Sequence, residues 1–278
     1  MSKRTTSYTS RTVAITGGAR GIGYETAREL LRRGHRVALG DIDEARLKEA
    51  ADQLGVTTYT RLDVTDPDSF RDFLDLVERD LGPLDVLVNN AGIMPTGHVH
   101  EEDDAVTRRQ VEINVLGVMF GTRLALQRML PRRSGHIINT ASLAGELAMP
   151  GLAAYCGTKY AVIGFTEAAR QEYRTSGVHL STVRPTFTNT ELVAGTGGVK
   201  GVRNAEPEEI ARATADLIER PRPFVRVTKV AGGMTAAMKF VPERVAVRLR
   251  SALGGESMFL DDVDLDQRRD YLDRLRSS

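Results

Sequence analysis

The sequence contains one cysteine, Cys156, and no tryptophan. A single thiol cannot form an internal disulfide, so a disulfide scaffold is excluded and a reducing compartment, the cytoplasm, is the expected location. The first residues, MSKRTTSYTSRT, lack the apolar stretch of a secretion signal. No run approaches the roughly 18 apolar residues that a membrane span requires. We therefore expect a cytoplasmic protein with no integral membrane segment.

The chain also lacks an excess of either charge, since 38 Lys and Arg residues are matched by 37 Asp and Glu residues. No overall field would draw such a protein to nucleic acid or to an anionic membrane. A small neutral or anionic molecule is therefore the expected ligand. With 278 residues, of which 41% are hydrophobic, the chain is long enough for one large domain and too short for two catalytic ones.

Short apolar runs alternate along the chain with segments of helical spacing. The runs predict seven strands, at residues 11–16, 36–40, 57–62, 84–88, 136–140, 178–184 and 224–230. The intervening segments predict helices at residues 24–33, 44–54, 69–80, 106–129, 153–174 and 207–219. This alternation predicts an α/β fold, a Rossmann-like, doubly wound parallel sheet of seven strands with helices on both faces. Ligands of such sheets bind at the carboxyl ends of the strands.

Three glycines, Gly17, Gly21 and Gly23, follow the first predicted strand in the sequence TGGARGIG. Glycine permits a tight turn and lets the backbone approach a pyrophosphate, while the N-terminus of the next helix offers free N–H groups to phosphate. We interpret the turn as a dinucleotide cradle, with Arg20 and Ile22 as further contact residues. A plain connection between strand and helix is the alternative.

The spacing T-G-x-x-x-G-x-G resembles that of the short-chain dehydrogenase/reductase family. Epimerases and dehydratases of the same superfamily usually have T-G-x-x-G-x-x-G, which would require a glycine where this chain has Arg20. The spacing therefore disfavours chemistry on a sugar nucleotide. The resemblance also implies a homodimer or homotetramer.

Two further pairs of residues extend the resemblance to the cofactor site. Asp63 and Val64, after the third predicted strand, match the pair that contacts adenine in the family. After the fourth strand, Asn89-Asn90-Ala91-Gly92 matches the family's NNAG signature, so Asn90, Ala91 and Gly92 become candidate cofactor contacts. Without the family, Asp63 could cap a turn and NNAG could be a tight turn alone.

Asp41, at the end of the second predicted strand, favours NAD over NADP. Its carboxylate can accept hydrogen bonds from both hydroxyls of the adenosine ribose. A 2′-phosphate would instead meet a like charge, and two unit charges about 4 Å apart at an effective dielectric of about 20 repel by about 4 kcal/mol. Arg20 opposes this interpretation, because family members that use NADP often have a basic residue at this place. Asp41 could alternatively cap the following helix, but Asp43 fits that role better.

Four residues match the catalytic tetrad of the family. Tyr155 and Lys159 are four residues apart on a predicted helix and share one of its faces. Ser142 follows the fifth strand at the edge where ligands bind, and Asn114 lies in the long helix at residues 106–129. A bare Y-x-x-x-K pair means little, but the order and spacing of all four make coincidence a poor explanation.

The chemistry of carbonyl reduction explains why these residue types are needed, because a proton must reach the developing alkoxide. A free phenol has a pKa of about 10 and is a poor base at pH 7. We expect the Lys159 ammonium to lower the pKa of Tyr155 by about 3 units. The resemblance implies that Lys159 also holds the nicotinamide ribose, that Ser142 bonds the substrate oxygen, and that Asn114 anchors a water of the proton relay.

The segment RPTFTNT follows the sixth strand, where the family has R-P-G-x-V-x-T. Thr186 replaces the glycine and Thr188 replaces the apolar residue. The resemblance makes Pro185, the Thr188 backbone and the Thr190 hydroxyl candidate contacts to the nicotinamide. The glycine-rich stretch at residues 191–205 is expected to be a mobile lid over the substrate, with a disordered connector as the alternative.

The last part of the chain departs from the pattern of alternating strands and helices. We expect a flexible N-terminus at residues 1–10, a catalytic domain at 11–232 and a helical C-terminal extension at 233–278. Apolar residues recur every three or four positions between Met234 and Leu253, with Lys and Arg among them, which predicts a basic amphipathic stretch. Packing against the protein itself or a partner subunit is the first interpretation, and peripheral membrane contact is the second.

Together these patterns predict an NAD(H)-dependent oxidoreductase that interconverts a moderately lipophilic alcohol and its carbonyl. An NADP(H)-dependent carbonyl reductase and a dinucleotide-sensing protein without turnover are the alternatives. His98 and His100, followed by an acidic run, match no compact zinc spacing, so no metal is expected. Cys156 is interpreted as a small packed residue.

Overall fold

The computed structural model describes residues 9–196 and 203–228, together with a few residues of the C-terminal extension. Those residues are Gly232, Gly233, Ala237, Val241, Phe259, Leu260, Val263, Asp264, Arg268 and Tyr271. The expectations for residues 1–8, for the middle of the segment at 191–205 and for most of the basic amphipathic stretch therefore lie outside the described residues.

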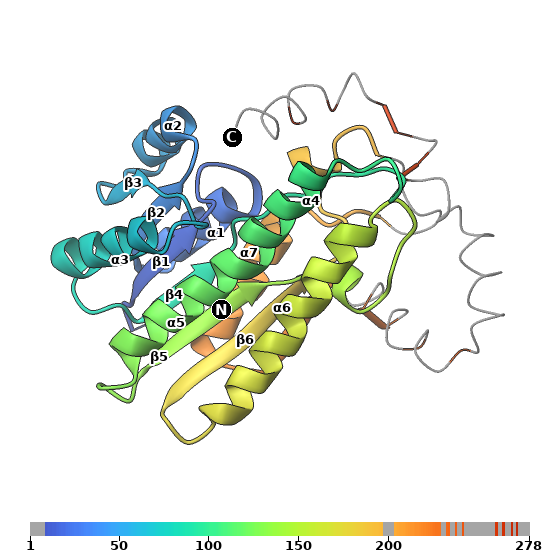
Figure 1. Cartoon of the computed structure of the whole chain (residues 1–278). Helices are drawn as coiled ribbons and strands as arrows, with labels where there is room; N and C mark the ends of the chain where they lie inside the picture. Colours follow the sequence, from blue (N-terminus) through green and yellow to red (C-terminus); the bar gives the residue numbers. More distant parts are fainter. Residues whose placement is uncertain are drawn as a thin grey trace, which may run out of the picture.

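Seven parallel strands form one sheet, as predicted, and the structure shows that their order is β3-β2-β1-β4-β5-β6-β7 (Figure 1). Their bounds are β1 Thr12–Thr16, β2 Arg36–Asp41, β3 Tyr59–Arg61, β4 Val86–Asn89, β5 Gly135–Thr140, β6 Val178–Pro185 and β7 Phe224–Val227. The chain winds outward from β1 to β3 and then returns to start again at β4. This makes the boundary between β1 and β4 the topological switch point of the sheet, where α/β proteins bind their ligands.

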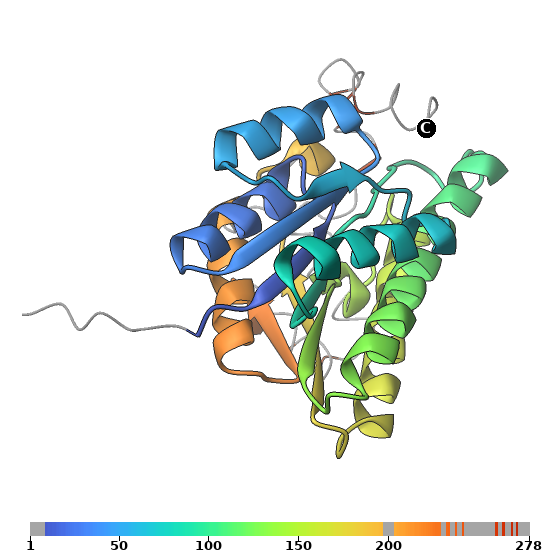
Figure 2. The same ribbon diagram turned by 90° about the vertical axis from the view of Figure 1, so that its left-hand side faces the viewer.

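Helices cover both faces of the sheet, as expected (Figure 2). On one face lie α1 (Gly21–Arg32), α2 (Glu44–Leu54) and α7 (Pro207–Glu219), and on the other lie α3 (Pro67–Leu81), α5 (Val118–Met129) and α6 (Ala153–Glu172). Because side chains alternate along a strand, Val13 and Ile15 of β1 belong to the first core and Ala14 to the second. Strands that are buried on both faces explain why the sequence shows continuous apolar runs.

The prediction of one continuous helix at residues 106–129 is wrong, because the segment is not α-helical throughout. The structure divides it into α4 (Asp104–Val111), a π-helical segment η1 (Glu112–Gly117) and α5. A π-helical turn is wider than an α-helical turn and is frequent at functional sites. Apolar periodicity does not reveal it, because the same face stays buried on both sides of the wider turn.

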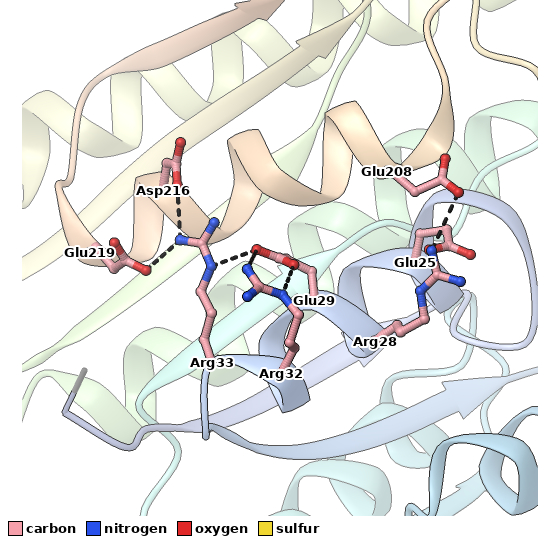
Figure 3. A network of polar contacts seen from close by, with 8 residues as sticks. All are labelled: Glu25, Arg28, Glu29, Arg32, Arg33, Glu208, Asp216 and Glu219. Carbon is pink, nitrogen blue, oxygen red and sulfur yellow. Dashed lines mark hydrogen bonds and ion pairs between the residues drawn. The ribbon is translucent and has the colours of Figure 1, made fainter. Parts of the chain in front are cut away.

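Ion pairs join α1 to α7 on the outside of the sheet (Figure 3). The Arg33 guanidinium, whose side chain is only 6% exposed, contacts Glu29 at 2.7 Å, Asp216 at 2.9 Å and also Glu219. Arg28 pairs with Glu208 at 3.3 Å near the other end of α7. These contacts hold in place the helix whose N-terminus follows the glycine turn.

Candidate active site

A cavity of about 490 Å³ lies at the carboxyl edge of the sheet, lined by residues that follow β1, β2, β3, β4, β5 and β6. Its position at the switch point is the one predicted from the sequence. The predicted site residues in its lining are Gly17, Arg20, Gly21, Ile22, Asp41, Asp63, Val64, Asn90, Ala91, Gly92, Ser142, Tyr155, Lys159, Pro185, Thr188 and Thr190. Two further predicted residues, Gly23 and Asn114, lie behind this lining and support it.

The glycine turn leaves room that side chains would fill. Gly17 adopts a φ of 66°, in the left-handed region, and a Cβ there would lie 2.9 Å from the Ala91 Cα. A Cβ on Gly23 would lie 2.0 Å from the Gly17 carbonyl oxygen, an impossible contact. The N-terminus of α1 therefore lies close against the turn, and the residues present fit a bound dinucleotide whose pyrophosphate faces that N-terminus.

The NNAG segment holds the turn from the neighbouring strand. The Asn90 side-chain amide donates to the carbonyl oxygens of Thr16 and Gly17, at 3.1 Å each. The Thr16 hydroxyl accepts from the backbone N–H groups of Asn90 and Ala91 at 2.9 and 3.0 Å. Asn90 thus joins the ends of β1 and β4 across the switch point, in addition to lining the cavity.

Asp41 is 8% exposed at the end of β2 and braces the turn on its other side. Its two carboxylate oxygens accept from the backbone N–H groups of Ala19 at 3.0 Å and Asp43 at 3.1 Å. Burial raises the pKa of Asp41, while these two hydrogen bonds oppose that shift. The alternative role in helix capping belongs to Asp43, whose side chain accepts from the Arg46 N–H at 3.1 Å.

The side chain of Arg20, a predicted cofactor contact, is 26% exposed and is held by two carboxylates. It forms ion pairs with Asp43 and, at 3.0 Å, with Glu191, which also pairs with Arg46 at 2.8 Å. The charge of Arg20 is therefore compensated by two carboxylates from distant parts of the chain. Glu191 had no recognisable signal in the sequence, because its role depends on the loop after β6 reaching the glycine turn.

Asp63 closes the turn that was its alternative role, and its contact with adenine stays a prediction. It lines the cavity, and its carboxylate accepts from the Thr65 N–H at 2.9 Å and hydroxyl at 2.6 Å, which closes a turn. Burial acts to raise the pKa of Asp63, but the hydrogen bonds from Thr65 and the charge of Arg109 outweigh it, so the pKa is lowered. Val64 packs against Gly117 of η1, where an added Cβ would lie 3.0 Å away.

Tyr155 and Lys159 are buried in the first turns of α6, with exposed fractions of 8% and 4%. The Lys159 ammonium donates to the Thr140 carbonyl oxygen at 3.0 Å and lies 5.6 Å from the centre of the Tyr155 ring. Burial lowers the pKa of Lys159 to about 8, so the side chain remains largely protonated at pH 7.

The shift of Tyr155 is opposite to the one expected from the sequence. Burial raises its pKa, although a hydrogen bond with Ser142 opposes the change. The reason is physical, since burial removes the phenolate from water and this effect is the largest influence on the pKa of Tyr155. The phenol is therefore protonated at neutral pH.

Ser142 is held by a short anchored segment after β5. Its hydroxyl accepts from the Ala144 N–H at 3.0 Å and caps the 3₁₀ turn η2 (Leu143–Gly145). Directly after that turn, the buried Glu146 carboxylate accepts from Arg184 at 2.8 Å and from Arg226 at 2.9 and 2.7 Å. This ion cluster, which the sequence did not reveal, ties the Ser142 segment to β6 and β7.

Asn114, in the π-helical segment, is fully buried and faces the loop that follows NNAG. Its amide exchanges two hydrogen bonds with the Ile93 backbone, accepting from N–H and donating to the carbonyl at 2.9 Å each. The second amide hydrogen goes to the Thr158 hydroxyl at 3.2 Å. Asn114 therefore connects the loop after β4 to the helix that carries Tyr155 and Lys159.

The segment after β6 crosses the cavity towards the glycine turn. Thr186, which stands in place of glycine, donates its N–H to the Val227 carbonyl at 2.7 Å. Thr188 forms a parallel bridge with Ala205, so the last residue of the glycine-rich segment at residues 191–205 pairs with the residue that precedes the segment by three positions. The Thr190 methyl group lies against Gly21, 3.3 Å from the position of a Cβ there.

Several cavity residues were missed by the sequence analysis. Met94, Phe187, Leu192 and Val193 supply an apolar wall beyond Tyr155, and Tyr271 of the C-terminal extension joins them. The apolar residues resemble ordinary core residues in the sequence. Nothing in the pattern of the extension singles out Tyr271, since its place depends on a return of the chain across the site.

Two features are absent from the residues that the structure describes. Those residues contain no cluster of three or more His, Cys, Asp or Glu side chains arranged to hold a metal ion. Within the same residues, every helix is too short or too polar to cross a bilayer.

Comparison with known proteins assigns the chain to a family. Residues 11–198 match the model of the short chain dehydrogenases. Cis-4-hydroxycyclohexanecarboxylate dehydrogenase of Sinomonas cyclohexanicum is 37% identical over 247 residues, which cover 82% of this chain and 98% of that protein.

Solved structures agree in fold. An alcohol dehydrogenase from Thermococcus sibiricus, complexed with 5-hydroxy-NADP, is 28% identical with a TM-score of 0.69, covering 78% of this chain and 96% of the other. A short chain dehydrogenase/reductase from Burkholderia phymatum, in complex with NAD, has a TM-score of 0.76 at 23% identity, covering 86% and 95%. The matched residues and the identity to a dehydrogenase along almost its whole length lead to one conclusion: the chain belongs to the short-chain dehydrogenase family of oxidoreductases.

Proposed function

We propose that this protein is an NAD(H)-dependent oxidoreductase that interconverts a moderately lipophilic primary or secondary alcohol and its carbonyl. The observation that carries the proposal is the burial of Tyr155 and Lys159 beside Ser142, in the same cavity as the glycine turn. The apolar wall beyond Tyr155 supports a lipophilic substrate. The names of two similar proteins, a hydroxycyclohexanecarboxylate dehydrogenase and an alcohol dehydrogenase, agree with this reaction class.

The roles of the residues follow from their protonation and position. A bound nicotinamide supplies the carbon that gives or accepts the hydride. Tyr155, protonated at neutral pH, donates its phenolic proton to the oxygen of a carbonyl that is being reduced, and Lys159 provides a positive charge nearby. Ser142 orients the same oxygen through its hydroxyl. Asn114 holds the loop after β4 in a fixed position relative to the helix that carries Tyr155 and Lys159.

The charges around the glycine turn support NAD as the cofactor. Asp41 presents a buried carboxylate at the end of β2, which favours ribose hydroxyls over a 2′-phosphate. Arg20, the residue that would favour NADP, is paired with Asp43 and Glu191. A phosphate at this place would therefore compete with two carboxylates for Arg20. An NADP(H)-dependent carbonyl reductase remains the second candidate, because Arg20 lines the cavity.

Two measurements test the proposal. Titration with NADH and NADPH, followed by nicotinamide fluorescence, is expected to show tighter binding of NADH, and tighter binding of NADPH would favour the second candidate. A panel of alcohols and ketones of increasing apolar size, followed by NADH absorbance, is expected to show turnover. Binding of NADH without turnover of any member would support a dinucleotide-sensing protein instead.

A further inference from the structure

Four described residues of the C-terminal extension contact the cavity or the loops around it, namely Phe259, Asp264, Arg268 and Tyr271, and all four lie outside the family match, which ends at residue 198. Arg268 is fully buried. Its guanidinium donates to the carbonyl oxygens of Leu192 at 2.9 Å and Ala194 at 3.1 Å, in the loop after β6. It also donates to the Met94 carbonyl at 3.0 Å, in the loop after β4. One side chain thus joins the two loops that border the apolar end of the cavity.

Tyr271 lies beside Arg268 and reaches the cavity itself. Its ring is stacked against the Arg268 guanidinium at 5.0 Å, and its hydroxyl accepts from the Met94 N–H at 2.7 Å. Burial is the main cause of the raised pKa of Tyr155, and Tyr271 adds to it by electrostatic repulsion. The phenol of Tyr271 therefore faces the same space as the proposed proton donor.

Two other residues of the extension make further contacts around the same opening. Phe259 is fully buried, with its ring centre 5.3 Å from that of Phe187 in the apolar wall. Gly151 fits beneath it, since a Cβ there would lie 2.5 Å from the Phe259 carbonyl oxygen. Asp264 donates its backbone N–H to the Gly195 carbonyl at 2.7 Å. The extension thus contacts three separate loops around the cavity.

We propose that Phe259, Asp264, Arg268 and Tyr271 of the extension form the roof of the substrate pocket in their own chain. In this roof Tyr271 is a specificity-determining residue, whose ring limits the size of the group attached to the reacting carbon. Arg268 is a positioning residue that holds the loops carrying Met94 and Leu192 at a fixed separation. The proposal rests on the alcohol–carbonyl function proposed above.

The first experiment compares Tyr271→Ala with Tyr271→Phe on a series of ketones with growing alkyl groups. Removing the ring is expected to raise kcat/KM for the largest ketone relative to the smallest by about tenfold or more, because apolar contacts in a pocket discriminate on this scale. The Phe variant keeps the ring and is expected to keep the order of preference. NADH affinity is expected to be unchanged in both. An unchanged order of preference in the Ala variant, with NADH still bound, would overturn the role of Tyr271.

The second experiment needs no substrate. Arg268→Met is expected to accelerate amide hydrogen exchange at residues 191–196, and Tyr271→Phe to accelerate it at Met94, whose N–H loses its acceptor. Arg174→Met, at an exposed arginine just after α6, is the matched control and is expected to change neither. Unchanged exchange in the Arg268 and Tyr271 variants would refute the roof. If the wild type turns over no alcohol or carbonyl, the proposed function is refuted. The hydrogen-exchange measurement still tests whether Arg268 and Tyr271 hold the two loops, because it does not depend on turnover.

Discussion

The two ends of the cavity are built by different means. At the cofactor end, backbone sterics dominate, since Gly17 and Gly23 pack so closely that no side chain fits between them. At the substrate end, the boundary depends on side chains, with Arg268 and Tyr271 bonded to backbone groups of Met94 that lie 174 and 177 residues away in sequence. Under the proposed function, a rigid cofactor end and a side-chain roof would allow substitutions in the roof to change the substrate while the cofactor is retained.

The largest effect on turnover is expected at Tyr155, which lies between the cofactor end and the substrate end of the cavity. Tyr155→Phe removes the proton donor and should lower kcat by about 10²–10⁴-fold, the usual contribution of a general acid. NADH binding should remain close to that of the wild type, because the ring is retained. Tyr160→Phe, at an exposed tyrosine of the same helix, is the matched control and should be nearly as active as the wild type. Near-normal turnover by the Tyr155 variant would refute the mechanism.

The next effect tests the cofactor end alone. In Gly23→Ala the new Cβ would meet the Gly17 carbonyl, so the turn must move, at a cost of about 1–3 kcal/mol. The dissociation constant of NADH is expected to rise by about tenfold or more. Gly164→Ala, in α6, has open space around it and should leave NADH binding unchanged. Equal NADH affinity in the two variants would show that the turn is less constrained than its geometry indicates.

A smaller change in cofactor preference is expected from Asp41→Asn. The amide keeps the size of the side chain but removes the negative charge, so the ratio of NADPH to NADH affinity should rise by about tenfold. Fluorescence titration of both dinucleotides measures this ratio. Asp52→Asn, on the exposed side of α2, should leave it unaltered. A constant ratio in the Asp41 variant would remove the electrostatic argument for NAD.

The smallest effect concerns Glu29 of α1, which pairs with Arg32 and Arg33 at the end of the same helix. The hydrogen bond from Arg32 is the largest cause that lowers the pKa of Glu29 from 4.5 to about 2, against the opposing effect of burial. Because the folded pKa lies below the ordinary value, the stabilisation is present above pH 4.5 and is lost as the pH falls towards 2. Glu29→Gln should therefore lower the free energy of unfolding by about 1 kcal/mol at pH 7, with the difference shrinking below pH 4.5.

Urea unfolding at a series of pH values measures this difference, with Glu49→Gln as the control at an exposed position of α2. NADH affinity at pH 7 should be unaffected by the Glu29 variant. A difference in stability that stays constant from pH 7 down to pH 3 would show that the carboxylate charge is not its cause.

The sheet was predictable because each of its strands has its own signal in the local sequence, a short apolar run. A strand buried on both faces must be apolar throughout, and alternation with helices leaves few topologies. The split of the helix at residues 106–129 was not predictable, since a π-helical turn keeps the same buried face. Likewise, the raised pKa of Tyr155 depends on burial by distant segments, so a pairwise estimate from Lys159 alone gave the wrong direction.

The amino-acid sequence by itself predicted the seven-stranded parallel sheet with helices on both faces, and the family to which the chain belongs, because these depend on local patterns and short spacings. The cofactor role of the glycine turn and the catalytic roles of Asn114, Ser142, Tyr155 and Lys159 stay predictions. Only the tertiary structure decided that Glu191 neutralises Arg20, that Glu146 anchors the Ser142 segment and that Tyr271 returns to the cavity. These contacts join residues far apart in sequence. The interaction energies of these contacts arise from the desolvation and pairing of groups that come together only in the folded chain. A local sequence pattern therefore cannot predict them.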